Sequence, residues 1–291
     1  MKNIIIFLIT LLLLMISCNK ENSTTETKQA DIVEPLTIVV ALDLSDRIVS
    51  EETRQRDIEN ILLAFDGFEE RVKNLHYVKS EDRFMLTLVR QTSTPAEVKT
   101  LCDTLSIDLA AYNMRQKREA MERFKNELPN KVRRIYELAN QQSLYSGADI
   151  YQYLERQLPA CLEMANGKVT LLLMTDGYIE LEPANENVQN NDRCNTMNSK
   201  TMHSLRKDDT FKQNSDILLV PEDLAQRKDL DRLRICVVGI QPKNTYIYEM
   251  EMVKNIWLTW LGKMNIDNRL IDYDQPAIVT KKLLINALHH S

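Results

Sequence analysis

The first apolar stretch after the N-terminal region reads Leu36-Thr-Ile-Val-Val-Ala-Leu-Asp43-Leu-Ser45-Asp46-Arg47, an apolar run that ends at carboxylate and hydroxyl side chains. A second stretch of the same kind reads Val169-Thr-Leu-Leu-Leu-Met-Thr175-Asp176-Gly177. Short continuous apolar runs are typical of strands that are buried on both faces of a parallel sheet. The two stretches therefore predict an α/β protein with a mostly parallel sheet.

Both apolar runs end close to an aspartate, which places polar groups where the strands end. In an open α/β sheet, ligands bind beyond the carboxyl ends of the strands, so we expect Asp43, Ser45 and Asp176 to converge at one edge. A single aspartate at such a position is often only a helix N-cap or a turn former. Two carboxylates and a hydroxyl together are hard oxygen ligands, and these suit Mg²⁺ or Mn²⁺.

The arrangement of these residues resembles the von Willebrand factor type A domain and its metal-ion-dependent adhesion site. In that family the first strand ends in Asp-x-Ser-x-Ser, a later strand ends in Asp-Gly, and a middle loop supplies a Thr. Asp43 and Ser45 match the first motif, and Thr175-Asp176-Gly177 matches the second. Arg47 stands in place of the second Ser, and Ala148 stands in place of the Thr.

The resemblance implies a metal ion that a carboxylate of the binding partner completes, so the site would serve adhesion rather than catalysis. Asp43, Ser45 and Asp176 would hold the ion directly or through water. Asp46 or Asp149 would replace the missing oxygen ligands. Mg²⁺ tolerates such gaps because it keeps several of its waters.

Arg47 offers a second outcome for the same site. If its side chain turns inward, the guanidinium occupies the position of the ion and pairs with Asp43 and Asp176. A fixed cation there repels a divalent ion, so we expect Mg²⁺ binding to be weak or absent in the unmodified chain. Arg47→Ser combined with Ala148→Thr would then restore the ligand set and strengthen binding.

Two classes of function fit this site. We expect the first, a binding module for a protein partner that the sequence does not identify. The alternative is a metal-dependent hydrolase that uses the carboxylates of Asp43 and Asp176 to activate water. The chain has 6 glycines, none in a Gly-rich phosphate loop, and it shows no nucleophile–base pair or histidine cluster. The absence of a histidine or lysine beside the two carboxylates would argue further against an enzyme.

The first 18 residues have the pattern of a bacterial lipoprotein signal peptide. Lys2 precedes the apolar run Ile4–Ile16, which is shorter than a membrane span and leads into Ser17-Cys18. This ending resembles a lipobox, so Cys18 is the expected site of lipidation, with palmitate among its acyl chains, and the membrane anchor. Residues 19–34 are polar and predict a disordered tether, in which Lys20-Glu21 resembles the charged surface-export signal of Bacteroidetes lipoproteins. We expect the outer membrane, at its periplasmic face or at the cell surface.

The chain of 291 residues is 44% hydrophobic and 27% charged, as in an ordinary globular protein, and its net charge of -5 argues against a nucleic-acid partner. We expect one domain over residues 35–291, a doubly wound, mostly parallel sheet flanked by helices. The resemblance covers about residues 36–275 of it. Two insertions are predicted, a helical one at about 96–141, broken at Pro129, and a polar loop at about 180–215. The charged residues of the helical insertion predict a solvated helix surface.

Apolar periodicity and capping residues predict the remaining elements. They are helices at 51–65, 149–163, 221–230 and 246–264, a C-terminal helix from Pro276, and strands at 84–89, 233–240 and 270–272. Trp257 and Trp260 share one helix face, which we expect to pack on the sheet. Four cysteines show no zinc-ligand spacing and their disulfide state is open, although the apolar surroundings of Cys236 predict a core residue. They are Cys102, Cys161, Cys194 and Cys236.

Overall fold

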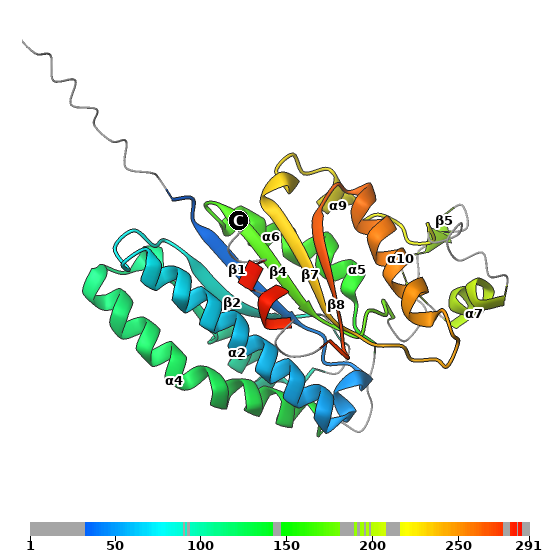
Figure 1. Ribbon diagram of the computed structural model, residues 1–291, viewed down its shortest axis with the longest axis horizontal. Coiled ribbons are helices and arrows are strands. Elements are labelled where there is room, and N and C mark those ends of the chain that lie inside the picture. Colours follow the sequence, from blue (N-terminus) through cyan, green and yellow to red (C-terminus); the bar gives the residue numbers. More distant parts are fainter. Residues whose placement is uncertain are drawn as a thin grey trace, which may run out of the picture. The chain divides into compact units, whose positions relative to one another are not determined.

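The computed structural model of the chain describes residues 33–89, 91, 94–141, 147–180, 189–190, 193–194, 196–197, 199–207, 216–275, 280–283 and 285–286. Within residues 34–291 the described part is a six-stranded sheet with helices on both faces (Figure 1). The predicted signal peptide with Cys18, most of the predicted tether, Ser146 and Pro276 lie outside the described residues.

The sheet has the strand order β3-β2-β1-β4-β7-β8. All neighbouring strands are parallel except β2 and β3, which are antiparallel. The chain adds β2 on one side of β1 and then adds β4, β7 and β8 on the other side, so β1 and β4 flank a topological switch point. The predicted doubly wound fold class is confirmed. The strands are β1 (Leu36–Leu42), β2 (Arg83–Leu88), β3 (Ser106–Asp108), β4 (Lys168–Met174), β7 (Leu233–Ile240) and β8 (Asp267–Asp272).

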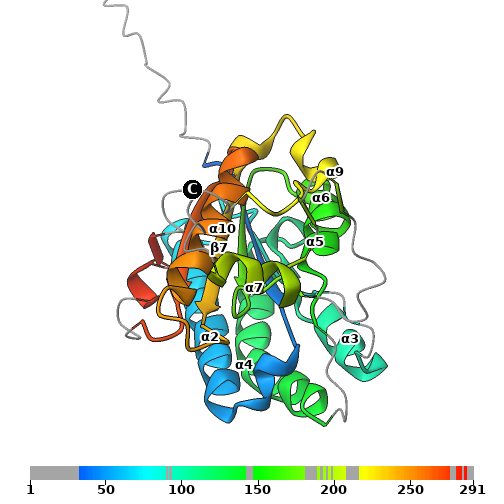
Figure 2. The ribbon, with the colours of Figure 1, turned by 90° about the vertical axis from the view of Figure 1, so that its right-hand side faces the viewer.

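Two helical layers cover the sheet, and Figures 1 and 2 show α2 and α4 side by side in one of them. The helices are η1 (Asp46–Val49), α2 (Glu51–Asn74), α3 (Ala96–Asp103), η2 (Leu109–Ala111), α4 (Met114–Ala139), α5 (Ile150–Gln152), the π-helical η3 (Tyr153–Gln157), α6 (Leu158–Met164), α7 (Ser199–Lys207), α9 (Glu222–Ala225), η5 (Leu230–Arg232) and α10 (Glu249–Lys263). A separate two-stranded ribbon pairs β5 (Gln189–Asn190) with β6 (Arg193–Cys194).

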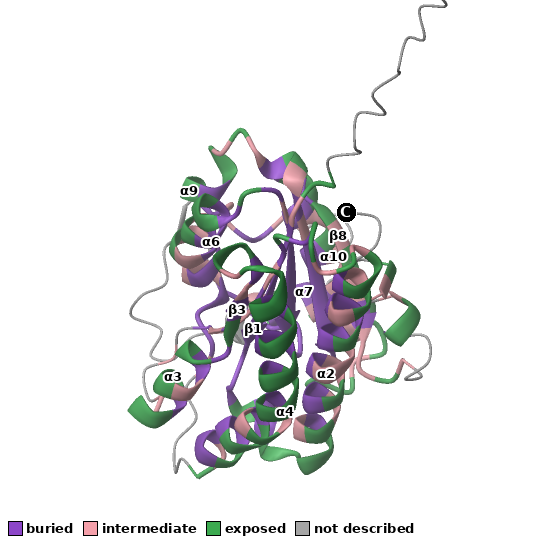
Figure 3. Ribbon diagram, turned by 90° about the vertical axis from the view of Figure 1, so that its left-hand side faces the viewer, coloured by how far each residue is buried: buried purple, intermediate pink, exposed green. Residues whose placement is uncertain are grey.

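Strand β1 shows why a continuous apolar run forms a central strand. All seven of its residues are buried, and successive side chains point to opposite faces of the sheet. Ile38 and Val40 join the core under α2, α3 and α4, whereas Val39 and Ala41 join the core on the other face. In Figure 3 the strands are buried while the outer face of α4 is exposed, as predicted for the charged surface of the insertion at 96–141.

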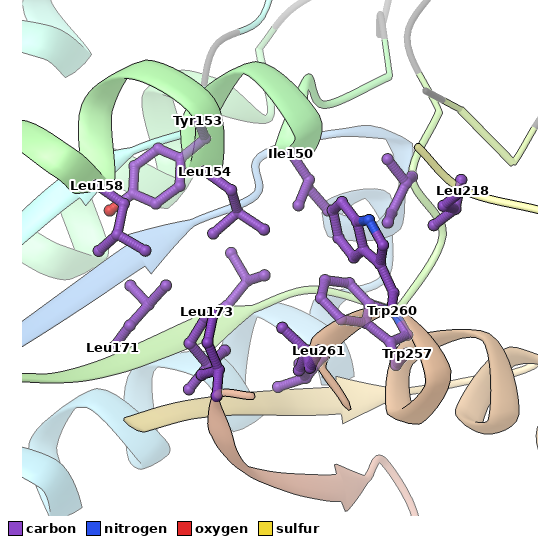
Figure 4. Packing of buried hydrophobic residues seen from close by; sticks show 14 of the residues in the cluster. Ile150, Tyr153, Leu154, Leu158, Leu171, Leu173, Leu218, Trp257, Trp260 and Leu261 are labelled. Carbon is purple, nitrogen blue, oxygen red and sulfur yellow. The ribbon is translucent and has the colours of Figure 1, made fainter. Parts of the chain in front are cut away.

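The second core contains the two tryptophans of α10. Trp257 and Trp260 are both almost completely buried, and their rings meet edge to face at 5.4 Å. They pack with Leu173 of β4 and with side chains from α5, η3 and α6 (Figure 4). The Trp257 indole N–H also donates to the carbonyl of Gly177 at 2.7 Å, which ties α10 to the turn after β4. The predicted burial of both tryptophans is confirmed.

The predicted helical insertion at 96–141 differs from the structure. It contains α3, the short edge strand β3 and α4 rather than two helices separated at Pro129. Helix α4 continues through Pro129 because buried residues on both sides, such as Leu128 and Val132, pack against the first core. The predicted break at Pro129 is therefore wrong, since tertiary packing outweighs the local cost of the proline.

Other boundaries shift by smaller amounts. The helix predicted at 51–65 extends to Asn74, and the helix predicted at 221–230 reduces to α9 and η5. The polar insertion predicted at 180–215 contains the amphipathic helix α7 among its described residues. Cys236 is buried in β7 as predicted, and Cys102 and Cys161 are also buried and free.

Candidate functional site

The carboxyl ends of β1 and β4 bring two of the predicted site residues together. Asp43 directly follows β1, and Asp176 lies two residues beyond the end of the parallel strand β4. The Asp43 N–H donates to the carbonyl of Met174 at 3.1 Å, and the Thr175 hydroxyl donates to Asp43 Oδ2 at 2.8 Å. Both aspartates are buried, so the two strand ends form one polar cluster beneath the surface.

The Asp43 carboxylate connects the two strand ends. Its Oδ1 accepts a hydrogen bond from the Ser45 N–H at 2.9 Å, while Oδ2 accepts the Thr175 hydroxyl. The Thr175 hydroxyl in turn accepts from the Gly177 N–H at 3.2 Å. Asp43 therefore already uses both oxygens to hold the loop after β1 against the turn after β4.

The cation beside Asp176 is Lys243, a residue that the sequence did not single out. Lys243 follows β7, and its Nζ lies 3.2 Å from Asp176 Oδ2. The same ammonium lies 3.3 Å from Asp46 Oδ1 and 3.6 Å from Glu180 Oε2. The predicted strand at 233–240 could have pointed to Lys243, because β7 is parallel to β4 and its carboxyl end therefore lies at the same edge.

Charge and burial oppose each other in this cluster. Burial raises the pKa of Asp176 to about 6, although Lys243 lowers it, and the nearby charge of Asp43 adds to the increase. Burial also disfavours the charge on Lys243, but the carboxylates of Asp176, Asp46 and Glu180 raise the pKa of the lysine well above its usual value. Lys243 is therefore a permanent ammonium at neutral pH.

Arg47 does turn inward, but it pairs with a residue other than the predicted ones. Its Nη1 and Nη2 donate to the two oxygens of Asp57 in α2, at 2.6 and 3.0 Å. Nη1 also donates to the main-chain carbonyl of Asp43 at 3.2 Å. The Tyr136 hydroxyl of α4 donates to Asp57 Oδ2 at 2.8 Å, so the ion pair belongs to a buried network. The expectation that Arg47 replaces the ion between Asp43 and Asp176 is wrong.

Gly239 makes room for the Arg47 guanidinium. It adopts a φ of +97°, a conformation that favours glycine. A Cβ at this position would lie 3.2 Å from Arg47 Nη2 and 3.3 Å from the carbonyl of Thr175. The end of β7 is therefore shaped to accept the Arg47–Asp57 pair.

The remaining predicted ligands have different roles. Asp149 is buried, and its Oδ1 accepts from the Gln152 N–H at 2.9 Å as the N-cap of α5. The Asp46 side chain is 62% exposed and contacts Lys243. A cavity of about 150 Å³ opens at this edge. It is lined by Ser45, Asp46, Gly147, Ala148, Tyr178, Glu180 and Lys243.

Tyr178 fixes the position of Lys243. The tyrosine hydroxyl accepts from the Lys243 N–H at 3.1 Å, and the ammonium lies 5.2 Å from the centre of the tyrosine ring. The same hydroxyl donates to the buried Glu249 at the start of α10. Arg206 of α7 forms a bidentate pair with Glu249, at 2.8 and 2.7 Å. The polar insertion and α10 therefore both support the lysine.

The residues in this arrangement do not fit a divalent ion. Lys243 neutralises the free oxygen of Asp176, and both oxygens of Asp43 accept hydrogen bonds. Among the residues that the structure describes, no three acidic, histidine or cysteine side chains are grouped for metal binding.

The hydrolase alternative gains no general base from this lysine. The absence of a histidine or lysine beside the two carboxylates would have argued against an enzyme, but Lys243 does lie beside Asp176. However, the raised pKa of Lys243 keeps its ammonium protonated, and an ammonium has no free electron pair to accept a proton from water.

Comparisons with other proteins do not identify a family. No family model, no curated protein and no solved structure matches the chain. None of the helices in the described residues is long and apolar enough to cross a membrane.

Proposed function

We propose that the chain is a lipid-anchored binding module of the bacterial cell envelope, which recognises another protein at the carboxyl-terminal edge of its sheet. The observation that carries this proposal is the cavity at the switch point, lined by Asp46, Glu180 and Lys243. Ligands bind at this place in open α/β sheets. The partly exposed charges there provide orientation and specificity for a partner surface, as polar groups in binding sites do.

The buried network beneath the cavity supports a role in binding. The hydrogen bond from Thr175 to Asp43 holds the two strand ends together. Asp176 accepts from the Tyr178 N–H, and Tyr178 holds the loop that carries Lys243. Such a support presents the exposed carboxylates in one fixed geometry, which lowers the entropy lost on binding. The resemblance to an adhesion domain and the lipoprotein-like N-terminus agree with this role.

Site-specific photo-crosslinking in the cells that make the protein tests the proposal. Val49 and Val78 offer a matched pair because their exposed fractions are 57% and 56%. Val49 ends η1 at the carboxyl-terminal edge, whereas Val78 lies in the turn before β2, at the opposite edge. A photoreactive amino acid at Val49 should yield one discrete protein adduct, and the same group at Val78 should not.

The adduct should also depend on the charges of the cavity. Asp46→Arg reverses the most exposed of the cavity carboxylates and should weaken the adduct formed from Val49. Equal adducts from both positions, no adduct from Val49, or an adduct that Asp46→Arg leaves unchanged would each contradict binding at this edge.

A further inference from the structure

We propose that Lys243 is the built-in cation of the strand-edge site and stands in the position that the resemblance assigns to a divalent ion. Its ammonium contacts the oxygen of Asp176 that the other hydrogen bonds of the site leave free. It also bridges Asp176 to Asp46, at the start of η1, and to Glu180, beyond the turn after β4. Bridging carboxylates across a sheet edge is the structural task that a bound ion would perform.

The geometry makes the lysine and a divalent ion mutually exclusive. Mg²⁺ binds carboxylate oxygens at about 2.1 Å, so an ion on Asp176 would lie only a few ångströms from the Lys243 ammonium. Two positive charges at that separation repel each other strongly in a partly buried site. A divalent ion would therefore have to expel the ammonium before it could bind Asp176.

The lysine also has the advantage of being tethered. A group that the chain holds next to its partner acts at an effective concentration of roughly millimolar or more. Tyr178 increases this advantage because it anchors the Lys243 N–H and lies beside the ammonium. The site therefore holds its own cation, and its bridging does not depend on metal.

Removal of the ammonium should convert this cluster into a metal site. Lys243→Ala leaves Asp176, Asp46 and Glu180 around the position of the ammonium, with Ser45 lining the same cavity. Since no three acidic side chains of the described residues are grouped for metal binding as they stand, a bound ion would draw these carboxylates together. We expect the wild-type protein to show no saturable Mn²⁺ binding by calorimetry through the millimolar range. Lys243→Ala should bind Mn²⁺ at least about tenfold more tightly than the wild type, and Mn²⁺ should raise its melting temperature.

Lys254→Ala is the matched control. Lys254 forms an ion pair with Asp272 at the end of β8, and the lysine side chains are similarly exposed, at 30% for Lys254 and 32% for Lys243. Removal of the Lys254 ammonium changes the net charge by the same amount as Lys243→Ala but should create no Mn²⁺ site. Lys243→Met preserves the packing over Tyr178 and serves if the alanine variant does not fold. Lys243→Met/Asp176→Asn should lose the gained binding.

Three outcomes would overturn the inference. The first is tight Mn²⁺ binding by the wild-type protein. The second is a folded Lys243→Ala or Lys243→Met variant that gains no binding. The third is an equal gain in Lys254→Ala, which would show a general charge effect. Each outcome leaves the crosslinking test of the proposed function untouched, because that test reports on a partner and this one on a cation.

Discussion

At the residue scale, the buried Arg47 and the partly exposed Lys243 pair with different carboxylates near the strand edge. Arg47 lies at the position where the resembled family has a serine ligand, yet its guanidinium passes inward to Asp57. Lys243 comes from a distant part of the chain and takes the place beside Asp176. Arg47 lies in η1 directly before α2, which carries Asp57, whereas Lys243 follows β7, the strand next to β4.

Loss of Arg47 should destabilise the protein strongly. In Arg47→Met the carboxylate of Asp57 remains buried without its cation, and both side chains of this pair are only 3% exposed. Breaking a buried pair by removing one partner typically costs about 3–5 kcal/mol in the free energy of unfolding. Urea denaturation would measure the loss, and a change below about 1 kcal/mol, the range of an exposed pair, would contradict the buried pairing.

A second variant separates the charge from the packing. Arg47→Met/Asp57→Asn removes both charges and keeps an amide oxygen for the Tyr136 hydroxyl, so it should recover part of the lost stability. Arg54→Met is a control, because Arg54 also contacts η1 but does so near the surface. It donates to the carbonyls of Ile48 and Val49. For the same reason Arg47→Ser with Ala148→Thr should destabilise the fold rather than build a metal site.

At the element scale, α4 shows how packing overrides a local signal. Asn113 begins the helix with a capping box, in which the side chains of Asn113 and Gln116 each accept a main-chain N–H. Pro129 lies inside the helix and cannot donate the hydrogen bond to the carbonyl four residues before it. The buried face of the helix on either side supplies the stabilisation that keeps the element continuous.

Replacement of this proline should stabilise the protein. Pro129→Ala restores a helix hydrogen bond and removes a clash worth about 3 kcal/mol, while the freer unfolded chain offsets up to about 1 kcal/mol. We expect a net gain of about 1–2 kcal/mol in the free energy of unfolding, measured by urea denaturation. Asn126→Ala, at an exposed site of α4, should gain only about 0.5 kcal/mol from helix propensity. A loss of stability in Pro129→Ala would show that the helix depends on the proline itself.

The link between α6 and β7 should depend on pH. Arg232 of η5 donates to the carbonyls of Ala165 and Gly167, and Asp229 orients this arginine. A hydrogen bond from Arg227, with a further one from Arg232, lowers the pKa of Asp229 to about 2. Because the pKa is lowered on folding, the stabilisation is present above the ordinary value near 4 and is lost as the pH falls to about 2.

Asp229→Asn tests this linkage. Melting temperatures of the wild type and the variant should differ at about pH 6 and converge as the pH approaches about 2. The corresponding difference in the free energy of unfolding is small, at most about 1 kcal/mol, because the carboxylate is partly exposed. A difference that stays constant over this range would assign the effect of Asp229 to packing instead of charge.

At the scale of the whole molecule, the doubly wound topology explains why the site lies at one edge. Strands β1, β4 and β7 are adjacent and parallel, so their carboxyl ends deliver Asp43, Asp176 and Lys243 to the same side of the sheet. The Trp257 contact with Gly177 couples this edge to the second core. The site is therefore held by both strands and helices, which suits a rigid binding surface.

The location of the whole protein should depend on one N-terminal residue. Cys18→Ala should abolish fatty-acid labelling and move the protein from the membrane fraction to a soluble or unprocessed form, because acylation of Cys18 is the expected anchor. Cell fractionation with a metabolic fatty-acid label would measure this, and Cys194→Ala is the cysteine control. Unchanged membrane retention with normal processing would assign the anchor to another part of the chain.

The sequence alone determined the fold class and the meeting of two aspartates, because both depend on regular features. Unbroken apolar runs specify buried parallel strands, and the switch-point rule then places Asp43 and Asp176 at one edge. Helix periodicity also located α10 with its buried tryptophans, since it involves residues close in sequence.

Only the tertiary structure decided which charges meet. Lys243 reaches Asp176 across 67 positions of the chain, and Arg47 selects Asp57 over the aspartates that the motif suggested. The edge strand β3 and the unbroken α4 likewise depend on neighbours that are distant in sequence. Ion pairing depends on distances of a few ångströms between side-chain tips, and residue order specifies these distances only after the backbone has been packed.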